Sequence, residues 1–176
     1  MSMSKTLLAA CAALGVSAGA AAQTPDLGHP VDETDLAPWD LSVPPDGHNL
    51  PAGAGTAREG AKVFQNRCAA CHGETGRENE TGLAPLAGGI GSLSGPMPVK
   101  TVGSYWPYAT TVFDYIRRAM PYDAPKSLNT SEIYAVTAYL LHINGIIAED
   151  AVMNAETLPE VEMPNRDGFT PAWPSD

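Results

Sequence analysis

Residues 66–73, Asn-Arg-Cys-Ala-Ala-Cys-His-Gly, place two residues between Cys68 and Cys71 and put His72 directly after the second cysteine. A structural zinc site needs four ligands, but Cys11 is the only other cysteine and the other histidines are scattered. A thioredoxin-type redox pair is expected beside a βαβ pattern, which is absent, and a disulfide within one helical turn would constrain little. The remaining chemistry is covalent attachment of haem, for which Cys-x-x-Cys-His is the signature.

The spacing has a geometric reason. Two thiols at the end of a helix can reach the two vinyl groups of one porphyrin, and His72 then lies under the iron as its proximal ligand. For the sixth iron ligand we predict Met120, because a thioether raises the reduction potential, as suits an electron carrier. Met163, which also precedes a proline, is the chief alternative, and Met97 is the third candidate. Met120 as a core filler, or an open sixth position in a haem enzyme or ligand sensor, also remain open.

Three further residues are weaker candidates for the haem pocket. Pro85 is expected to offer its carbonyl to the free ring nitrogen of His72 and so fix the tautomer of the imidazole. Tyr105 and Trp106 have polar groups that could hydrogen-bond the haem propionates. Simple packing in the core is the alternative for both aromatic residues.

The first 22 residues are typical of a secretory signal peptide. Lys5 precedes an apolar, alanine-rich stretch that closes on Ala-Ala-Ala-Gln, which predicts cleavage after Ala22 and export to the periplasm. A lipoprotein box ending at Cys11 is the alternative, although few apolar residues precede that cysteine. No other segment approaches the roughly 18 apolar residues that span a bilayer, so no membrane span is expected.

Charge divides the rest of the chain into three parts. Residues 23–50 carry six acidic and no basic side chains, residues 146–176 carry seven acidic and one basic, and residues 51–145 carry eight basic and seven acidic. We therefore expect an acidic N-terminal extension (23–50), a core domain (51–145) and an acidic C-terminal extension (146–176). The proline-rich extensions are interpreted as solvated arms, or as arms that wrap the core or dock on a partner. The net charge of −10 argues against nucleic acid as a partner.

The core is expected to be all-α. One helix follows Thr56 as N-cap, a second covers residues 111–118 and ends near Met120, and a third begins at a capping box from Asn129 to Glu132. Asn144 and Gly145 supply the stop signal of the third helix. No alternating strand pattern is found. The Gly/Pro-rich region 73–107 is too long for a loop without a function in a compact domain. A large buried cofactor would fill the space that this region encloses.

The residues from 55 to 145 resemble class I c-type cytochromes, in the haem motif at 64–73, the Leu-Ala-Pro-Leu loop at 83–86, the Met-Pro at 120–121 and the final amphipathic helix. Residues 101–110, 113–121 and 163–169 are similar to the cytochrome subunits of bacterial sulfite and sulfane dehydrogenases. This resemblance implies a small all-α bundle around one covalent haem c, with His72 and Met120 as axial ligands.

The same resemblance implies an electron-transfer protein, with no catalytic residues of its own. Its partners would be a molybdopterin subunit that donates electrons and a downstream cytochrome or terminal oxidase that accepts them. With one haem motif, the chain resembles one half of the two-haem sulfane dehydrogenase cytochrome, or a single-haem sulfite dehydrogenase partner.

Overall fold

The computed structural model describes residues 27–36, 38–77, 82–170 and 172–173. The expected signal peptide and its cleavage site therefore lie outside the described residues. The chain divides into two units, residues 1–36 and residues 37–176. In the described part of the first unit, a short helix α2 (Glu33–Leu36) has no buried residue. The second unit contains all the other helices and strands of the described chain.

The three expected helices are confirmed, with caps that the sequence specifies. Helix α3 (Ala57–Arg67) begins at Thr56, whose side chain accepts from the Glu59 backbone while the Glu59 carboxylate accepts from the Thr56 backbone. Helix α7 (Thr130–Ile143) begins at the same reciprocal arrangement between Asn129 and Glu132. Helix α6 (Ala109–Ala119) ends where expected, with Met120 as its C-cap residue. Local sequence therefore decides where these helices start and stop.

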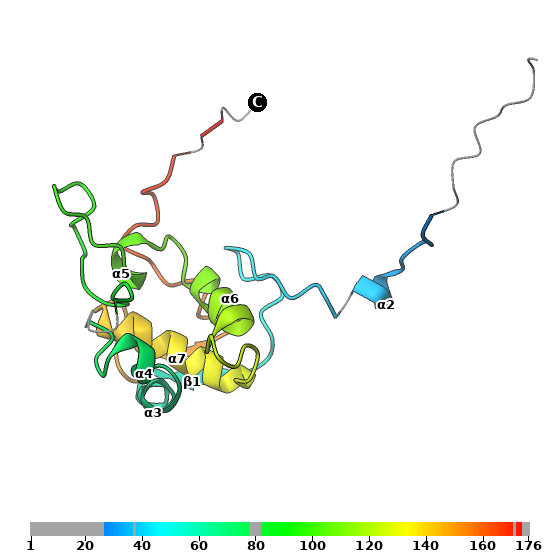
Figure 1. Ribbon diagram of the computed structural model, residues 1–176, viewed down its shortest axis with the longest axis horizontal. Coiled ribbons are helices and arrows are strands. Elements are labelled where there is room, and N and C mark those ends of the chain that lie inside the picture. Colours follow the sequence, from blue (N-terminus) through cyan, green and yellow to red (C-terminus); the bar gives the residue numbers. More distant parts are fainter. Residues whose placement is uncertain (1–26, 37, 78–81, 171, 174–176) are drawn as a thin grey trace, which may run out of the picture. The chain divides into compact units, whose positions relative to one another are not determined.

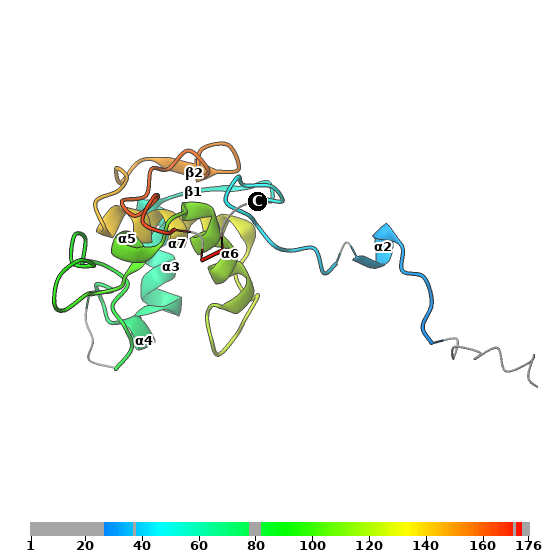
Figure 2. The same ribbon diagram turned by 90° about the horizontal axis from the view of Figure 1, so that it is seen from above.

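Helices α3 and α7 cross at very short range, as Figures 1 and 2 show. Gly60 makes this possible, because a Cβ atom built there would lie 1.9 Å from the carbonyl oxygen of Ala135. Helix α6 packs on α7 through Phe113 and Tyr134, whose ring centroids are 4.5 Å apart. Both rings are fully buried, and the Tyr134 hydroxyl donates to the carbonyl of Pro51 at 3.0 Å.

Two shorter helices lie in and beside the long loop region, and the sequence did not predict them. Helix α4 (Ala69–His72) carries the haem motif, and helix α5 (Val102–Tyr105) starts at a capping box between Thr101 and Ser104. Among the described residues, none of the helices combines the length and apolar character that a bilayer crossing requires.

A two-stranded antiparallel sheet is a correction to the expectation of no strands. Strand β1 (Ala54–Thr56) pairs with strand β2 (Val152–Asn154), with Gly55 opposite Met153. Each strand has three residues, too few for an alternating pattern to be recognised in the sequence. The pairing joins the segment just before α3 to the C-terminal extension.

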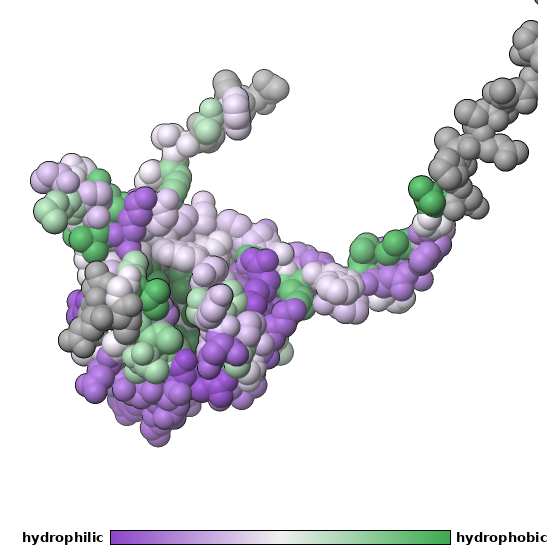
Figure 3. Space-filling view, in the orientation of Figure 1, coloured by the Kyte–Doolittle hydropathy of each residue, from purple (hydrophilic) through white to green (hydrophobic). Residues whose placement is uncertain are grey.

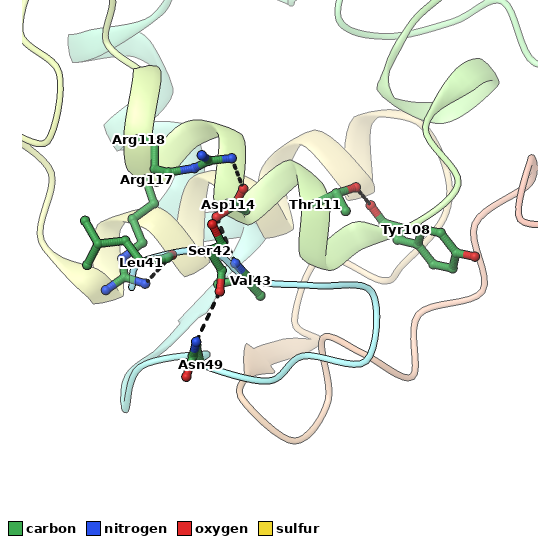
Figure 4. A network of polar contacts seen from close by, with 9 residues as sticks. All are labelled: Leu41, Ser42, Val43, Asn49, Tyr108, Thr111, Asp114, Arg117 and Arg118. Atoms are coloured by element: carbon green, nitrogen blue, oxygen red, sulfur yellow. Dashed lines mark hydrogen bonds and ion pairs between the residues drawn. The ribbon is translucent and has the colours of Figure 1, made fainter. Parts of the chain in front are cut away.

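The end of the N-terminal extension packs on helix α6 (Figure 4). The backbone N–H of Val43, a buried residue, donates to the Asp114 carboxylate at 3.0 Å. Arg117 donates to the carbonyl of Leu41 at 3.1 Å, and the Arg118 guanidinium pairs with the other Asp114 oxygen. Residues 41–43 are therefore held by side chains of α6.

The C-terminal extension also lies on the helices. After β2, its side chains Leu158, Val161 and Met163 are buried. Farther along, the Asn165 amide donates to the carbonyl of Tyr105 at 2.7 Å. The sequence left open whether the extensions are solvated arms, wrap the core or dock on a partner. In the structure, residues 41–50 and 146–169 pack on the core.

Candidate haem site

The haem motif forms one tight turn after helix α3. The carbonyl of Cys68 accepts from the backbone N–H of Cys71 at 3.1 Å and from that of His72 at 2.9 Å. Cys68 is itself tied to α3, because its N–H donates to the carbonyl of Phe64 at 2.8 Å. This geometry places both cysteines and the histidine along a single cavity.

The cavity has a volume of about 580 Å³, within the range of roughly 300–1,000 Å³ typical of ligand and cofactor sites. Figure 3 shows it as a hollow with hydrophobic walls. The walls come from five parts of the chain: α3 and α4, the loop at 83–86, residues 100–102 and 106, α6 with residues 120–123 and 128 after it, and α7. Its apolar lining includes Phe64, Leu86, Val102, Val112, Ile116, Leu128, Val136 and Leu140.

Met120 lies on this cavity, and the two rival methionines do not. Met120 is partly buried at the C-terminal end of α6, where its backbone N–H donates to the carbonyl of Ile116 at 3.1 Å. Met163, in the C-terminal extension, is 3% exposed and belongs to the hydrophobic core, and it is not part of the cavity lining. Met97 is 81% exposed on a surface loop. Of the three candidates for the sixth ligand, only Met120 shares a cavity with His72.

His72 has an imidazole suited to binding a metal. Burial lowers its pKa, which favours the neutral ring that a metal requires. Its Nδ1 atom is buried and makes no hydrogen bond to the described residues. Pro85 lines the cavity, yet the expected bond from Nδ1 to its carbonyl is not present. The backbone next to Pro85 is held elsewhere, since the Leu86 N–H donates to the carbonyl of Gly76 at 2.7 Å.

The two aromatic candidates for the haem pocket, Trp106 and Tyr105, lie in different surroundings. Trp106 lines the cavity and meets Tyr115 edge to face, with ring centroids 5.7 Å apart. Tyr105 is not part of the lining; its ring packs against Phe169 at 5.2 Å and under the ammonium of Lys100 at 4.9 Å. In the structure, Tyr105 packs against its neighbours outside the cavity lining, and its contact with a propionate stays a prediction.

The two cysteines are thiols, not joined in a disulfide. Burial raises the pKa of the Cys68 thiol to about 11, so this group is protonated at neutral pH. Cys71 is exposed at the edge of the same cavity. Among the described residues, no three histidine, cysteine or acidic side chains gather into a metal site.

Sequence reasoning missed two basic residues, Arg67 and Lys100, that also line the cavity. Arg67 precedes the motif directly and donates to the Ser127 hydroxyl. Lys100 comes from the loop ahead of α5, and nothing in its local sequence indicates that it lies near the motif. Their positive charge complements a ligand that carries carboxylates.

These residues fit a covalently bound haem c. Cys68 and Cys71 would form the thioether bonds, and His72 and Met120 would hold the iron. The neutral imidazole that burial favours at His72 and the apolar walls are both consistent with a cavity built for a large, mostly apolar group that contains a metal.

Comparison with known proteins agrees with a haem site in this cavity. The sequence model for cytochrome c matches residues 57–144. The structure resembles a chain in the crystal structure of the sulfane dehydrogenase SoxCD from Paracoccus pantotrophus, with a TM-score of 0.77 and 41% identity over 84% of this chain and 72% of that chain. No curated protein matches the chain. This protein therefore belongs to the cytochrome c family, whose members carry covalently bound haem c and transfer electrons.

Proposed function

We propose that the protein is a single-haem periplasmic cytochrome that accepts electrons from a molybdopterin sulfite or sulfane dehydrogenase subunit and passes them to a downstream cytochrome or terminal oxidase. The observation that carries this proposal is the meeting of Cys68, Cys71, His72 and Met120 at one cavity. The likeness to a chain of the SoxCD sulfane dehydrogenase supports the choice of donor.

Each part of the cavity has a role in this function. Haem iron, when bound, takes up and releases one electron at a time. Cys68 and Cys71 would attach the group covalently, and His72 and Met120 would bind its iron. The apolar walls exclude water from the site, which helps to set the reduction potential.

The mouth of the cavity is accessible to a partner. Three of the residues that line it, Leu83, Tyr115 and Tyr122, are exposed large hydrophobic side chains, and Tyr122 is 86% exposed. Exposed apolar side chains gathered around a cofactor site are typical of a surface that meets another protein. Electrons would enter and leave through this mouth.

Maturation of the full chain in a host competent for c-type haem attachment tests the cofactor and its ligands. We expect a coloured protein whose mass exceeds that of the polypeptide by one haem, with the weak red absorption band of sulfur-to-iron ligation when oxidised. Met120→Ala should lose this band and Met163→Ala should keep it. A colourless product, or carbon monoxide binding by the native protein, would refute the proposal.

The donor is tested separately with the molybdopterin subunit of a sulfane dehydrogenase and its sulfur substrate. We expect the ferric wild-type protein to be reduced only when both are present. If the coloured, six-coordinate protein stays oxidised, the protein is an electron carrier that serves another donor.

A further inference from the structure

We propose that the loop at residues 89–99 is a preformed docking element for the electron-donor protein, which it meets through an uncharged, apolar surface. This inference rests on the proposed function and adds the surface at which the partner binds. The loop projects from the helices beside α5 in both Figure 1 and Figure 2.

The loop combines an uncharged sequence with exposed apolar side chains. Its sequence, Gly-Ile-Gly-Ser-Leu-Ser-Gly-Pro-Met-Pro-Val, has no charged residue, in a chain with a net charge of −10. Three of its apolar side chains are exposed, Met97 at 81%, Ile90 at 52% and Val99 at 39%. None of the three belongs to the hydrophobic core of the described residues. Exposed apolar groups that do not support the fold indicate a surface for binding.

The loop is ordered by its own hydrogen bonds. Ser92 ties its two ends together, since the Ser92 hydroxyl donates to the carbonyl of Gly89 at 2.6 Å and accepts from the backbone N–H of Val99 at 2.9 Å. At its base, the Ser104 hydroxyl donates to the carbonyl of Val99 at 2.6 Å. Gly89 allows the close approach of the ends, because a Cβ there would lie 2.4 Å from that same carbonyl oxygen. A loop held in one shape loses little conformational entropy on binding.

A second hollow lies beneath the loop. It has a volume of about 330 Å³ and is lined by Ile90 and Leu93 of the loop, by Ser104 of α5 and by Pro164 and Asn165 of the C-terminal extension. A protruding apolar side chain of the partner can enter this hollow while Met97 contacts the partner's surface. Pockets that accept one anchoring side chain are common at the centre of protein interfaces.

The position of the loop favours an electron-transfer partner. Lys100 and Thr101, the two residues that follow it, line the haem cavity. A protein bound to the loop therefore lies beside the site from which electrons leave or enter.

The occupant is a different protein, not a second copy of this chain. Two copies of the chain would each carry a net charge of −10, and this like charge of the two molecules opposes their association even though the loop itself is uncharged. Because the loop has no charge, its contribution to binding should depend little on salt, in contrast to docking through charged side chains.

The test uses the haem-loaded full chain and the molybdopterin subunit of a sulfane dehydrogenase as the probe. The variant Ile90→Thr/Met97→Gln removes two exposed apolar groups, and Val152→Thr is the matched control, since Val152 is 47% exposed on β2 and outside both cavities. We expect the double variant to bind the probe about tenfold or more weakly by calorimetry, at low and high salt alike. The control should bind as the wild type does, and all three should have the same haem spectrum.

A photoreactive amino acid provides a second readout. Placed at position 97 it should cross-link to the molybdopterin subunit, and placed at position 152 it should not. Equal affinity of wild type and double variant would overturn the docking role while the proposed function stands. Failure of the wild type to bind or be reduced would overturn both the docking role and the proposed electron donor. Cross-linking from position 97 to a second copy of the cytochrome would show that the loop is a self-association surface instead.

Discussion

The side-chain amide of Asn144, at the end of α7, donates a hydrogen bond of 3.1 Å to the carbonyl of Leu86, in the loop that forms one wall of the haem cavity. The same amide donates to the carbonyl of Leu140 at 2.8 Å, and its oxygen accepts from the backbone N–H of Gly88 at 3.0 Å. Asn144 is buried, and Gly103 lies so close that a Cβ there would be 2.4 Å from the Asn144 oxygen. One side chain thus fastens the haem loop to the last helix.

Replacement of Asn144 by leucine should therefore destabilise the folded protein strongly. It removes the side-chain partner of the Gly88 N–H and of the Leu140 carbonyl in a buried site, at a cost of about 1–3 kcal/mol. The Leu86 carbonyl keeps one partner, since it also accepts from the backbone N–H of Val102 at 3.1 Å. Urea unfolding of the haem-loaded protein measures this loss. Asn144→Asp, a second variant that keeps the shape of the side chain, should also destabilise the protein, because its oxygen would face the carbonyls of Leu86 and Leu140 in place of the amide donor. Wild-type stability of the leucine variant would contradict the role given to these bonds.

Substitution of Gly60 by alanine should force α3 and α7 apart. The new Cβ would lie 1.9 Å from the backbone oxygen of Ala135, which cannot move aside as a flexible side chain can. Overpacking of this kind costs about 1–3 kcal/mol or more. The measurement is the shift in thermal midpoint, with Lys62→Ala on the exposed part of α3 as the control that should change little. An unshifted midpoint for Gly60→Ala would mean that the helices can separate freely.

Removal of the Asp114 carboxylate should release the end of the N-terminal extension from α6. In Asp114→Ala the buried N–H of Val43 loses its acceptor, at a cost of about 1–3 kcal/mol. Limited proteolysis should then cut the chain near residues 41–50 faster than in the wild type. Arg118→Ala removes only the half-exposed ion-pair partner of Asp114, so it should cost less than about 1 kcal/mol and leave proteolysis unchanged. If the protease cuts Asp114→Ala no faster than the wild type near residues 41–50, other contacts hold this segment.

The Glu59 carboxylate should make helix α3 sensitive to acid. Hydrogen bonds from the Thr56 side chain and backbone hold the pKa of Glu59 below its ordinary value. A lowered pKa in the folded state stabilises the protein above the pKa of the unfolded chain, about 4.3, and this contribution is lost as the pH falls through the lower, folded value. Glu59→Gln has no carboxylate to titrate, so the stability difference between wild type and variant should shrink over that acid range. A difference that is constant from neutral pH to pH 3 would contradict this assignment.

Much of the protein could be predicted from short stretches of sequence. The haem motif at Cys68, Cys71 and His72, the caps at Thr56 and Asn129, and the end of α6 before Pro121 each depend on residues within a few positions of one another. Such signals can be recognised without any knowledge of the fold, because helix caps and the haem-attachment motif depend on local geometry. The helices followed from them, and the haem motif is part of the resemblance to c-type cytochromes, the family that the cytochrome c model match confirms.

Tertiary structure decided what depends on residues far apart in the chain. It brought Met120 to the cavity and buried Met163 elsewhere, turned Tyr105 toward Phe169, and added Arg67 and Lys100 to the lining. It also paired β1 with β2. These outcomes depend on packing between segments that are distant in the chain, because a position in the core that one side chain fills is closed to another. No short stretch of sequence indicates which distant segments will be in contact.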